Sequence, residues 1–257
     1  MRAIVTRPEI EADRWVRELS QRGLDAIALP LVAISPAHEL EPLRNAWRDL
    51  ESFQAVMFVS GNAVSSFFLA RPSGAVVAWP PTTRAWAPGP GTVQALIRAG
   101  LDRRLIDSPA ADAAQFDSES LWQQAAGQVR AGSRVLIVRG ADAGGRGSGR
   151  EWLAEQLAEA GAGVESLVAY RRGRPEWNSQ QLELARQAAA DGSVWLFSSS
   201  EALANLRALL PDQDWSRARA IATHPRIAES ARKTGVGVVC VSRPGLEAVV
   251  ADLESFR

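Results

Sequence analysis

The length, composition and charge of this chain are those of a globular protein with a sizeable core. Its 257 residues suit two domains of ordinary size, and 46% hydrophobic with 23% charged residues is typical of a soluble fold. The formal net charge of zero argues against a general nucleic-acid binder. The single cysteine, Cys240, excludes an intramolecular disulfide and fits a reducing cytoplasm. Because residues 3–6 already read as a strand and no long apolar segment follows, we expect neither a signal peptide nor a transmembrane helix.

Short apolar runs alternate with longer amphipathic stretches along the whole chain. Helices are predicted between the runs, for example over residues 11–22 and 149–160, with Gly161 as a C-cap and with Asp117 and Ser179 as N-caps. This alternation indicates an α/β fold in which parallel sheets carry helices on both faces. The apolar runs predict strands over residues 3–6, 26–29, 55–59, 76–79, 84–87, 134–138, 164–170, 194–197, 218–222 and 236–241.

Three segments do not fit this alternation. Residues 30–36 are held extended by two prolines, and residues 166–172 run from a strand towards Pro175 with few turn residues. Both segments are expected to connect structural units. The glycine-rich loop over residues 140–149, which contains Arg146, is expected to be mobile.

Two halves of the chain carry similar sequence patterns. Ser60 and Ser198 both follow a buried strand and precede a helical pattern, and they are 138 residues apart. An offset of 135 residues relates residues 87–90 to residues 222–225. We interpret these pairs as a duplicated α/β unit. Two such units facing each other would form a cleft, and in open α/β sheets ligands bind beyond the carboxyl ends of the strands.

Tyr170 is the only tyrosine, although the chain has nine tryptophans. A phenol can donate a proton or a hydrogen bond, so this position is a candidate for more than aromatic bulk. The alternative is a connector residue that packs its ring and leaves its hydroxyl in solvent. The residues alone leave both interpretations open.

Hydroxyl and amide residues lie at the predicted turns from strand to helix. At such turns, backbone N–H groups and the positive end of the helix dipole attract anions. The alternative is plain N-capping, in which the side chains only cap and the amides do any binding. The candidate residues are Ser60, Asn62, Thr92, Ser198, Ser199 and Ser200.

Arginine is the second group of candidates, because every basic side chain except Lys233 is an arginine. Arg7 and Arg139 follow strands in equivalent positions of the two halves, and Arg226 opens a helix. A guanidinium at these places can hold a carboxylate with two hydrogen bonds. The alternative is a solvated surface side chain, which is the role we expect for most of the other arginines.

Signals for a bound metal or nucleotide are absent from the sequence. His38 and His224 are far apart and lack accompanying carboxylates or thiols, so no metal site is predicted. No P-loop pattern, dinucleotide fingerprint or nucleophile elbow occurs. Residues 88–91 resemble a nucleotide loop only superficially, because two prolines remove amide donors there.

Taken in order, nine short motifs resemble the uroporphyrinogen-III synthase family, the enzymes that close the tetrapyrrole ring in haem biosynthesis. Each motif alone is weak, but their order and spacing cover essentially the whole chain. The motifs lie at residues 6–8, 30–34, 58–64, 87–92, 117–121, 135–140, 168–172, 197–200 and 224–228.

The resemblance implies two flavodoxin-like parallel-sheet lobes, joined by a two-stranded bridge and separated by a cleft. One lobe would hold residues 1–35 with 173–257, and the other residues 36–168. The implied enzyme is a monomeric, cytoplasmic lyase without a cofactor, a nucleic-acid partner or a membrane partner. It would cyclise hydroxymethylbilane to uroporphyrinogen III, with inversion of ring D and loss of water.

The resemblance also implies roles for individual residues. The tyrosine that corresponds to Tyr170 faces the cleft and helps the substrate hydroxyl leave as water. The acetate and propionate groups of the substrate would meet the helix-end turns and the arginines. One departure is the turn His224-Pro225-Arg226, which stands where the family has a Gly-Pro-Thr type of turn, so a hydroxyl contact is in doubt there.

Two other function classes are alternatives to this interpretation. A two-lobed binding protein of the periplasmic type, without catalytic activity, would also close on a ligand through paired crossovers. The absence of an export signal disfavours it. A nucleotide-dependent α/β enzyme is disfavoured by the lack of phosphate-binding motifs.

Overall fold

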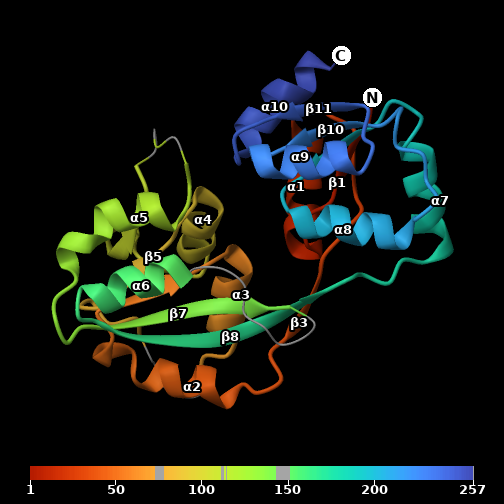
Figure 1. Ribbon diagram of the computed structural model, residues 1–257. Coiled ribbons are helices and arrows are strands. Elements are labelled where there is room, and N and C mark those ends of the chain that lie inside the picture. Colours follow the sequence, from red (N-terminus) through yellow and green to blue (C-terminus); the bar gives the residue numbers. More distant parts are fainter. Residues whose placement is uncertain (73–77, 111–112, 114, 143–150, 257) are drawn as a thin grey trace. The chain divides into compact units, whose positions relative to one another are not determined.

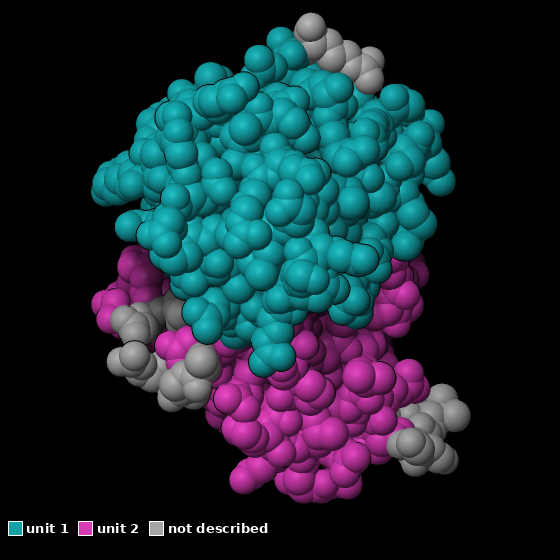
Figure 2. Space-filling view, turned by 90° about the vertical axis from the view of Figure 1, so that its right-hand side faces the viewer, with its two compact units in different colours: residues 1–33, 173–257 teal, residues 34–172 magenta. Residues whose placement is uncertain are grey.

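The computed structural model describes residues 1–72, 78–110, 113, 115–142 and 151–256. The chain divides into two compact units, the first combining Met1–Ala33 with Gly173–Arg257 and the second formed by Ile34–Arg172 (Figure 2). The backbone therefore passes between the units twice. These passages lie at the start of β3 (Ala33–Pro36) and the end of β8 (Gly163–Gly173), which are neighbours in one sheet (Figure 1).

The first unit is built on a five-stranded parallel sheet with the order β11-β10-β9-β1-β2. Numbered within the unit from the other edge, this order is 2-1-3-4-5, which is the flavodoxin-like arrangement. The elements are β1 (Ala3–Val5), α1 (Glu9–Gln21), β2 (Ala26–Ala28), α7 (Ser179–Ala188), β9 (Val194–Phe197), α8 (Ser200–Leu209), β10 (Arg219–Ala222), α9 (Pro225–Lys233), β11 (Val238–Val241) and α10 (Leu246–Ser255).

The second unit is built on a six-stranded sheet with the order β3-β8-β7-β4-β5-β6, in which the pairs from β8 to β6 are parallel. Three short 3-10 helices, at Leu50–Ser52, Arg103–Leu105 and Ala126–Gln128, interrupt its connections. Besides β3 and β8, the elements are α2 (Glu41–Arg48), β4 (Ala55–Phe58), α3 (Gly61–Leu69), β5 (Arg84–Trp86), α4 (Pro90–Arg98), β6 (Ile106–Asp107), α5 (Ser118–Ala125), β7 (Arg134–Ala141) and α6 (Glu151–Glu159). The predicted α/β class with two parallel-sheet units is confirmed.

The two sheets have the same strand arrangement. The row β8-β7-β4-β5-β6 corresponds to the row β2-β1-β9-β10-β11, and the helices between corresponding strands also match. The second unit is thus a flavodoxin-like unit whose chain begins at a different strand and which carries β3 as an addition. The predicted correspondence between Ser60 and Ser198 is off by one residue. Ser60 and Ser199 are both helix N-caps, so Ser199 rather than Ser198 corresponds to Ser60.

The helices follow from an apolar face that packs against the sheet and from residues that end the helix. In α1, the buried residues Ala12, Trp15 and Leu19 share one helix face. Gly23 follows this helix with a φ of 75°, and Gly161 follows α6 with a φ of 77°. Glycine adopts such angles without the steric cost that other residues meet. The predicted C-cap at Gly161 is confirmed.

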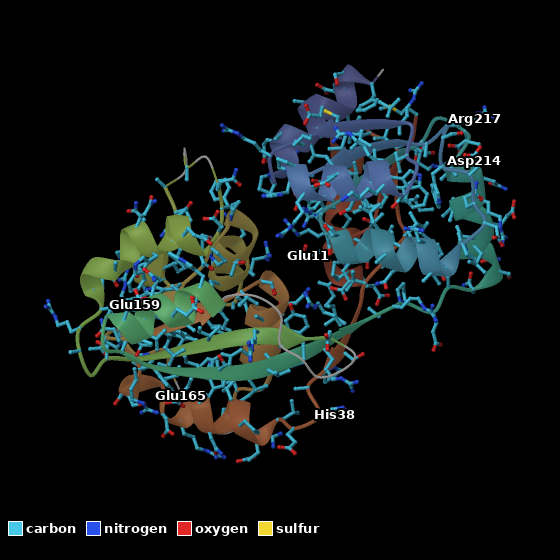
Figure 3. All side chains as sticks on the ribbon, in the orientation of Figure 1. Glu11, His38, Glu159, Glu165, Asp214 and Arg217 are labelled. Carbon is cyan, nitrogen blue, oxygen red and sulfur yellow. The ribbon has the colours of Figure 1, made fainter. Side chains whose placement is uncertain are left out.

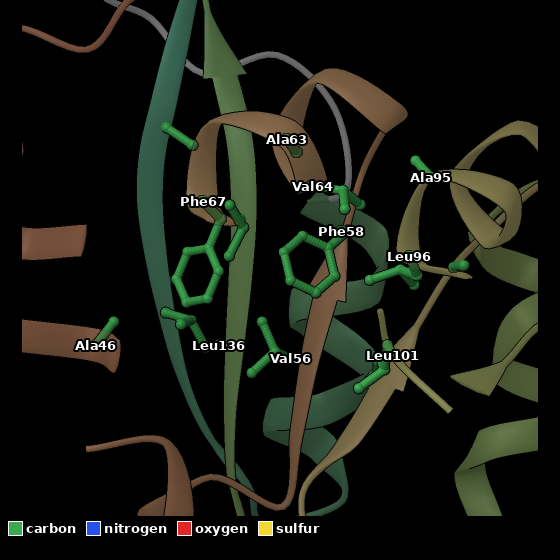
Figure 4. Packing of buried hydrophobic residues seen from close by; sticks show 14 of the residues in the cluster. Ala46, Val56, Phe58, Ala63, Val64, Phe67, Ala95, Leu96, Leu101 and Leu136 are labelled. Atoms are coloured by element: carbon green, nitrogen blue, oxygen red, sulfur yellow. The ribbon is translucent and has the colours of Figure 1, made fainter. Parts of the chain in front are cut away.

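Strand residues of the second unit alternate between two cores. Val56, Phe58 and Leu136 pack with residues of α2, α3 and α4 on one face (Figure 4). Met57 and Ile137 pack with residues of α5 and α6 on the other face. Because both faces are covered, the strands are apolar throughout, as parallel sheets require. A cavity left by replacing a fully buried phenylalanine such as Phe58 with alanine would cost about 3–5 kcal/mol.

Several predicted boundaries differ from the structure. Strands β3 and β6 were not predicted, because four and two residues are too short to show a period. Residues 76–77 of the predicted strand 76–79 lie outside the described residues, and Ala78 and Trp79 are not in a strand. Trp79 instead donates its Nε1–H to the Thr83 carbonyl at 2.8 Å. The N-cap predicted at Ser179 is Asn178, whose side chain accepts from the Gln181 N–H.

The glycine-rich loop also begins later than expected. Gly140 and Ala141 are the last residues of β7, because they pair with Tyr170 and Arg171 of β8 beyond a register shift. Residues 143–149 of the predicted loop lie outside the described residues, as do residues 149–150 of the predicted helix.

Candidate active site

The candidate residues of the second unit gather where the strand order reverses. The chain runs outward from β4 through β5 to β6 and then returns to β7 on the other side of β4. Ligands of open α/β folds bind at the carboxyl ends of the strands beside such a switch point. Ser60 follows β4 there, Arg139 is near the end of β7, and Tyr170 lies near the end of the adjacent β8.

Tyr170 is fixed within the second unit. Its side chain is 3% exposed, and its hydroxyl oxygen lies 3.0 Å from the Ser60 Oγ. The interpretation in which the hydroxyl projects into solvent is therefore wrong. Ser60 also accepts the Ala63 N–H at 3.2 Å, which makes it the N-cap of α3. Ser60 therefore caps α3 and contacts the Tyr170 hydroxyl at the same time.

Gly140 completes this arrangement and was not among the predicted site residues. A Cβ built on Gly140 would lie 2.6 Å from Cε2 and 2.8 Å from the hydroxyl oxygen of Tyr170. Real Cβ atoms do not approach so closely, so the ring needs a glycine at this place. A glycine inside a predicted strand often marks such a close approach, and this signal was available in the sequence.

Arg139 has the environment of a ligand-binding guanidinium. Its Nε is buried and has no hydrogen-bond partner among the residues that the structure describes. A buried donor without a partner costs free energy, which an incoming carboxylate would recover.

The first unit has an equivalent switch point between β1 and β9. Val5 pairs with Leu196 there, as Ile137 pairs with Met57 in the second unit, so Arg7 and Arg139 both lie two residues beyond matched strand positions. The equivalence expected for the two arginines therefore holds in the register of the sheets.

Arg7 nevertheless differs from Arg139 in its contacts. Its Nη1 lies 3.0 Å from a carboxylate oxygen of Glu11, and its guanidinium lies 4.1 Å from the ring centroid of Trp15. Figure 3 labels Glu11, which lies on α1. Burial lowers the pKa of Arg7, and the Glu11 carboxylate opposes that shift. The spacing of four residues between Arg7 and Glu11 is a pairing signal that the prediction did not use.

The serines of the first unit have separate tasks. The Ser199 Oγ accepts the Glu201 N–H at 3.1 Å and caps α8, whereas Ser200 is the first helical residue. The Ser230 Oγ lies 3.3 Å from the Ser200 Oγ and 3.0 Å from the Arg226 carbonyl. Ser230 was missed by the prediction and links the starts of α8 and α9. Ser198 lies in the turn before them and is partly buried.

The remaining candidates occupy first helical turns. Thr92 is buried in α4, and Asn62 is partly buried in α3. Arg226 is an exposed residue of α9, and its N–H is accepted by the His224 Nδ1 at 3.1 Å. The N-cap role belongs to His224, whose ring nitrogen accepts at the turn that departs from the family's pattern. The candidates therefore form two groups, one in each unit.

The described residues contain neither a metal-binding cluster nor a membrane-spanning helix. Within residues 1–72, 78–110, 113, 115–142 and 151–256, no three His, Cys, Asp or Glu side chains are grouped so that they could hold a metal ion. Over the same ranges, no helix has the length and apolar character needed to cross a membrane.

The chain is similar to known proteins along most of its length. The family described as uroporphyrinogen-III synthase HemD matches residues 13–251. A uroporphyrinogen-III synthase of Chlorobaculum parvum (strain DSM 263 / NCIMB 8327) is 29% identical over 182 residues, which are 69% of this chain and 66% of that relative. The match thus spans slightly less than two thirds of the relative.

Solved structures with the same fold agree with this match. The uroporphyrinogen-III synthetase of Helicobacter pylori 26695 has a TM-score of 0.61 at 17% identity, with both chains covered completely. A mutant uroporphyrinogen III synthase of Thermus thermophilus has a TM-score of 0.55 at 16% identity, with 100% of this chain and 98% of the other covered. At these low identities the solved structures support the fold alone. The family assignment rests on the match over residues 13–251. The chain belongs to the uroporphyrinogen-III synthase family, whose members are cyclising lyases of tetrapyrrole biosynthesis.

Proposed function

We propose that this protein converts hydroxymethylbilane into uroporphyrinogen III, with loss of water and inversion of ring D. The observation that carries the proposal is the phenol of Tyr170, held by Ser60 at the switch point of the second unit. The adjacent strand β7 carries Arg139, whose Nε lacks a partner among the described residues. An acid and an anion-binding cation at the carboxyl ends of neighbouring strands suit a substrate that must lose a hydroxyl and that carries many carboxylates.

The first step is the departure of the terminal hydroxyl as water. The Tyr170 proton moves to the hydroxyl oxygen, and the carbon–oxygen bond breaks with its electron pair leaving on that oxygen. The pyrrole nitrogen supplies electrons to the carbon, which gives a delocalised azafulvenium cation. A proton released when the macrocycle closes restores the phenol.

The second task is geometric. Because the linear substrate also closes unaided to the symmetric type I isomer, the enzyme must fold it so that the substituted carbon of ring D attacks. A spiro intermediate then lets ring D turn round. Positioning of this kind is the larger part of the catalysis, since a well-oriented intramolecular reaction avoids much of the entropy cost.

Substrate carboxylates would be held by helix-end amides and by arginine. In the second unit the proposed contacts are Arg139 and the first turns of α3 and α4. In the first unit they are the turn after β9 and the start of α9. The residues proposed to bind substrate are Arg7, Ser60, Asn62, Thr92, Arg139, Ser198, Ser199, Ser200 and Arg226. Arg139 has the strongest support, because Arg7 already pairs with Glu11.

The activity test is incubation of the purified full chain with hydroxymethylbilane, without added metal or nucleotide. The products are oxidised and separated by isomer. The proposal predicts mainly the type III isomer, formed faster than the uncatalysed type I isomer. Only type I product at the uncatalysed rate would reject it, and tight binding without turnover would favour the two-lobed binding protein instead. We also propose that the enzyme works as a cytoplasmic monomer, which light scattering during size-exclusion chromatography would test for oligomeric state.

A further inference from the structure

The contact between Ser60 and Tyr170 joins two elements that are far apart in the chain. Ser60 ends the turn after β4, and Tyr170 lies on β8, so β7 runs between them in the sheet. The two hydroxyl oxygens are 3.0 Å apart, and either one can be the donor. If the phenol donates, its proton is committed to Ser60, and if Ser60 donates, it is not.

The neighbouring strand limits the movement of the phenol. Gly140 of β7 pairs with Tyr170 of β8, and the ring lies so close to the Gly140 Cα that no Cβ fits between them. With Tyr170 3% exposed, the ring has little room to turn. The distance between the two hydroxyls is therefore a property of the packed unit.

The Ser60 hydroxyl is already an acceptor on one side. It receives the Ala63 N–H at the start of α3, where the positive end of the helix dipole also lies. A hydroxyl whose oxygen accepts a hydrogen bond becomes a stronger donor, because hydrogen bonds in a chain polarise one another. The favoured direction in the row Ala63 N–H, Ser60 hydroxyl, Tyr170 hydroxyl is thus from the helix towards the phenol.

We propose that Ser60 is a positioning residue that donates its hydrogen to the Tyr170 oxygen, so that the phenol keeps its own proton for the leaving hydroxyl of the substrate. The same bond stabilises the phenolate that remains after the proton has moved. The catalytic part of this inference rests on the function proposed above, whereas the direction of the bond is a property of the protein without substrate. It adds a positioning role to the substrate-binding role proposed above for Ser60.

The direction of the bond can be measured because Tyr170 is the only tyrosine. Infrared spectra of the protein with ring-labelled and unlabelled tyrosine isolate the phenol carbon–oxygen stretch of this one residue. Accepting a hydrogen bond weakens that carbon–oxygen bond, and donating one strengthens it. In Ser60→Ala the band is expected to move to higher frequency than in the wild type. A shift to lower frequency, or no shift, would overturn the proposal.

Activity gives the second readout. Ser60→Ala is expected to lower kcat about tenfold with a smaller change in KM, which is less than the roughly 100-fold or more that loss of the acid itself typically costs, because the phenol remains. Ser60→Thr, which keeps a hydroxyl and can still cap the helix, is expected to restore most of the kcat. Loss of kcat in Ser60→Thr equal to that in Ser60→Ala would contradict the proposal.

A matched variant separates this effect from the loss of a helix cap. Asp117 caps α5 in the same unit by accepting the Ser120 N–H at 2.9 Å. Asp117→Ala and Ser60→Ala should lower the melting temperature by similar amounts, but only Ser60→Ala should lower kcat. An equal kcat loss in both variants would mean that helix capping alone explains the effect. If the wild type makes no type III isomer, the proposed function fails, while the band shift still decides the direction of the bond.

Discussion

The two units place similar residues at equivalent switch points, yet the contacts of those residues differ. In the first unit, Arg7 is paired with Glu11 and stacked on Trp15. In the second unit, the Arg139 Nε has no partner among the described residues, and the neighbouring strand supplies Tyr170. The difference therefore lies at the equivalent arginines, since Arg7 has a partner within its own unit and the Arg139 Nε has none among the described residues. From this difference we expect the acid–base chemistry to depend mainly on the second unit.

The largest effect on substrate binding is expected from removing the guanidinium of Arg139. Arg139→Gln should raise KM for hydroxymethylbilane about 10-fold to 100-fold, because a hydrogen bond to a charged group contributes about 1.5–3 kcal/mol. Its melting temperature should change little, since the Nε bonds to no described residue. Initial rates of type III formation over a range of substrate concentrations give KM.

Arg7→Gln is the matched variant for that prediction. It should lower the free energy of unfolding by about 1 kcal/mol, because it removes the contact with Trp15 and the pair with Glu11. Its effect on KM should be smaller than that of Arg139→Gln. Equal effects of the two variants on KM would contradict the difference between the units.

The close approach of Tyr170 to Gly140 gives the next prediction. Gly140→Ala should displace the phenol from Ser60, so kcat should fall about tenfold and the free energy of unfolding by about 1–3 kcal/mol. Gly173→Ala is the control, because Gly173 ends β8, the strand that carries Tyr170, and a Cβ there meets no atom within 4 Å. Chemical denaturation and steady-state kinetics measure both quantities. Full activity in Gly140→Ala would show that the position of the ring does not matter.

A smaller effect on stability is expected from removing the hydrogen bond of Thr6, a residue whose equivalent in the second unit has no hydroxyl. The buried Thr6 donates its hydroxyl to the Leu196 carbonyl at 2.6 Å and joins β1 to β9, whereas the register places Val138 at the equivalent position of the second unit. Thr6→Val should lower the free energy of unfolding by about 1 kcal/mol and the melting temperature by about 2–4 °C. Calorimetry measures this, with the less buried Thr234→Val as the comparison. An unchanged melting temperature would mean that the bond adds nothing.

Local chemistry explains what the sequence predicted correctly. The parallel strands follow from apolar runs that are buried on both faces, and the cap at Asp117 and the turn at Gly161 follow from the chemistry of single residues. The equivalence of Arg7 and Arg139 was also visible, because duplicated units keep their order of elements.

What the sequence could not predict depends on contacts between distant residues. Ser60 and Tyr170 are 110 positions apart and meet only because β4, β7 and β8 are neighbours in the sheet. The clash that a side chain on Gly140 would meet depends on the same strand pairing. The strand Ile106–Asp107 has two residues, which is too short for a hydrophobic period.

The most direct test of this account is Tyr170→Phe, which keeps the ring against Gly140 and removes only the hydroxyl. The rate of type III formation should fall at least about tenfold, because a general acid is lost, while the electron-rich pyrrole still pushes its hydroxyl out. The free energy of unfolding should fall by only about 1 kcal/mol, the usual cost of one hydrogen bond. The remaining product should still be mainly type III, since substrate positioning survives. Wild-type turnover in Tyr170→Phe would contradict the claim that this phenol is the acid of the reaction.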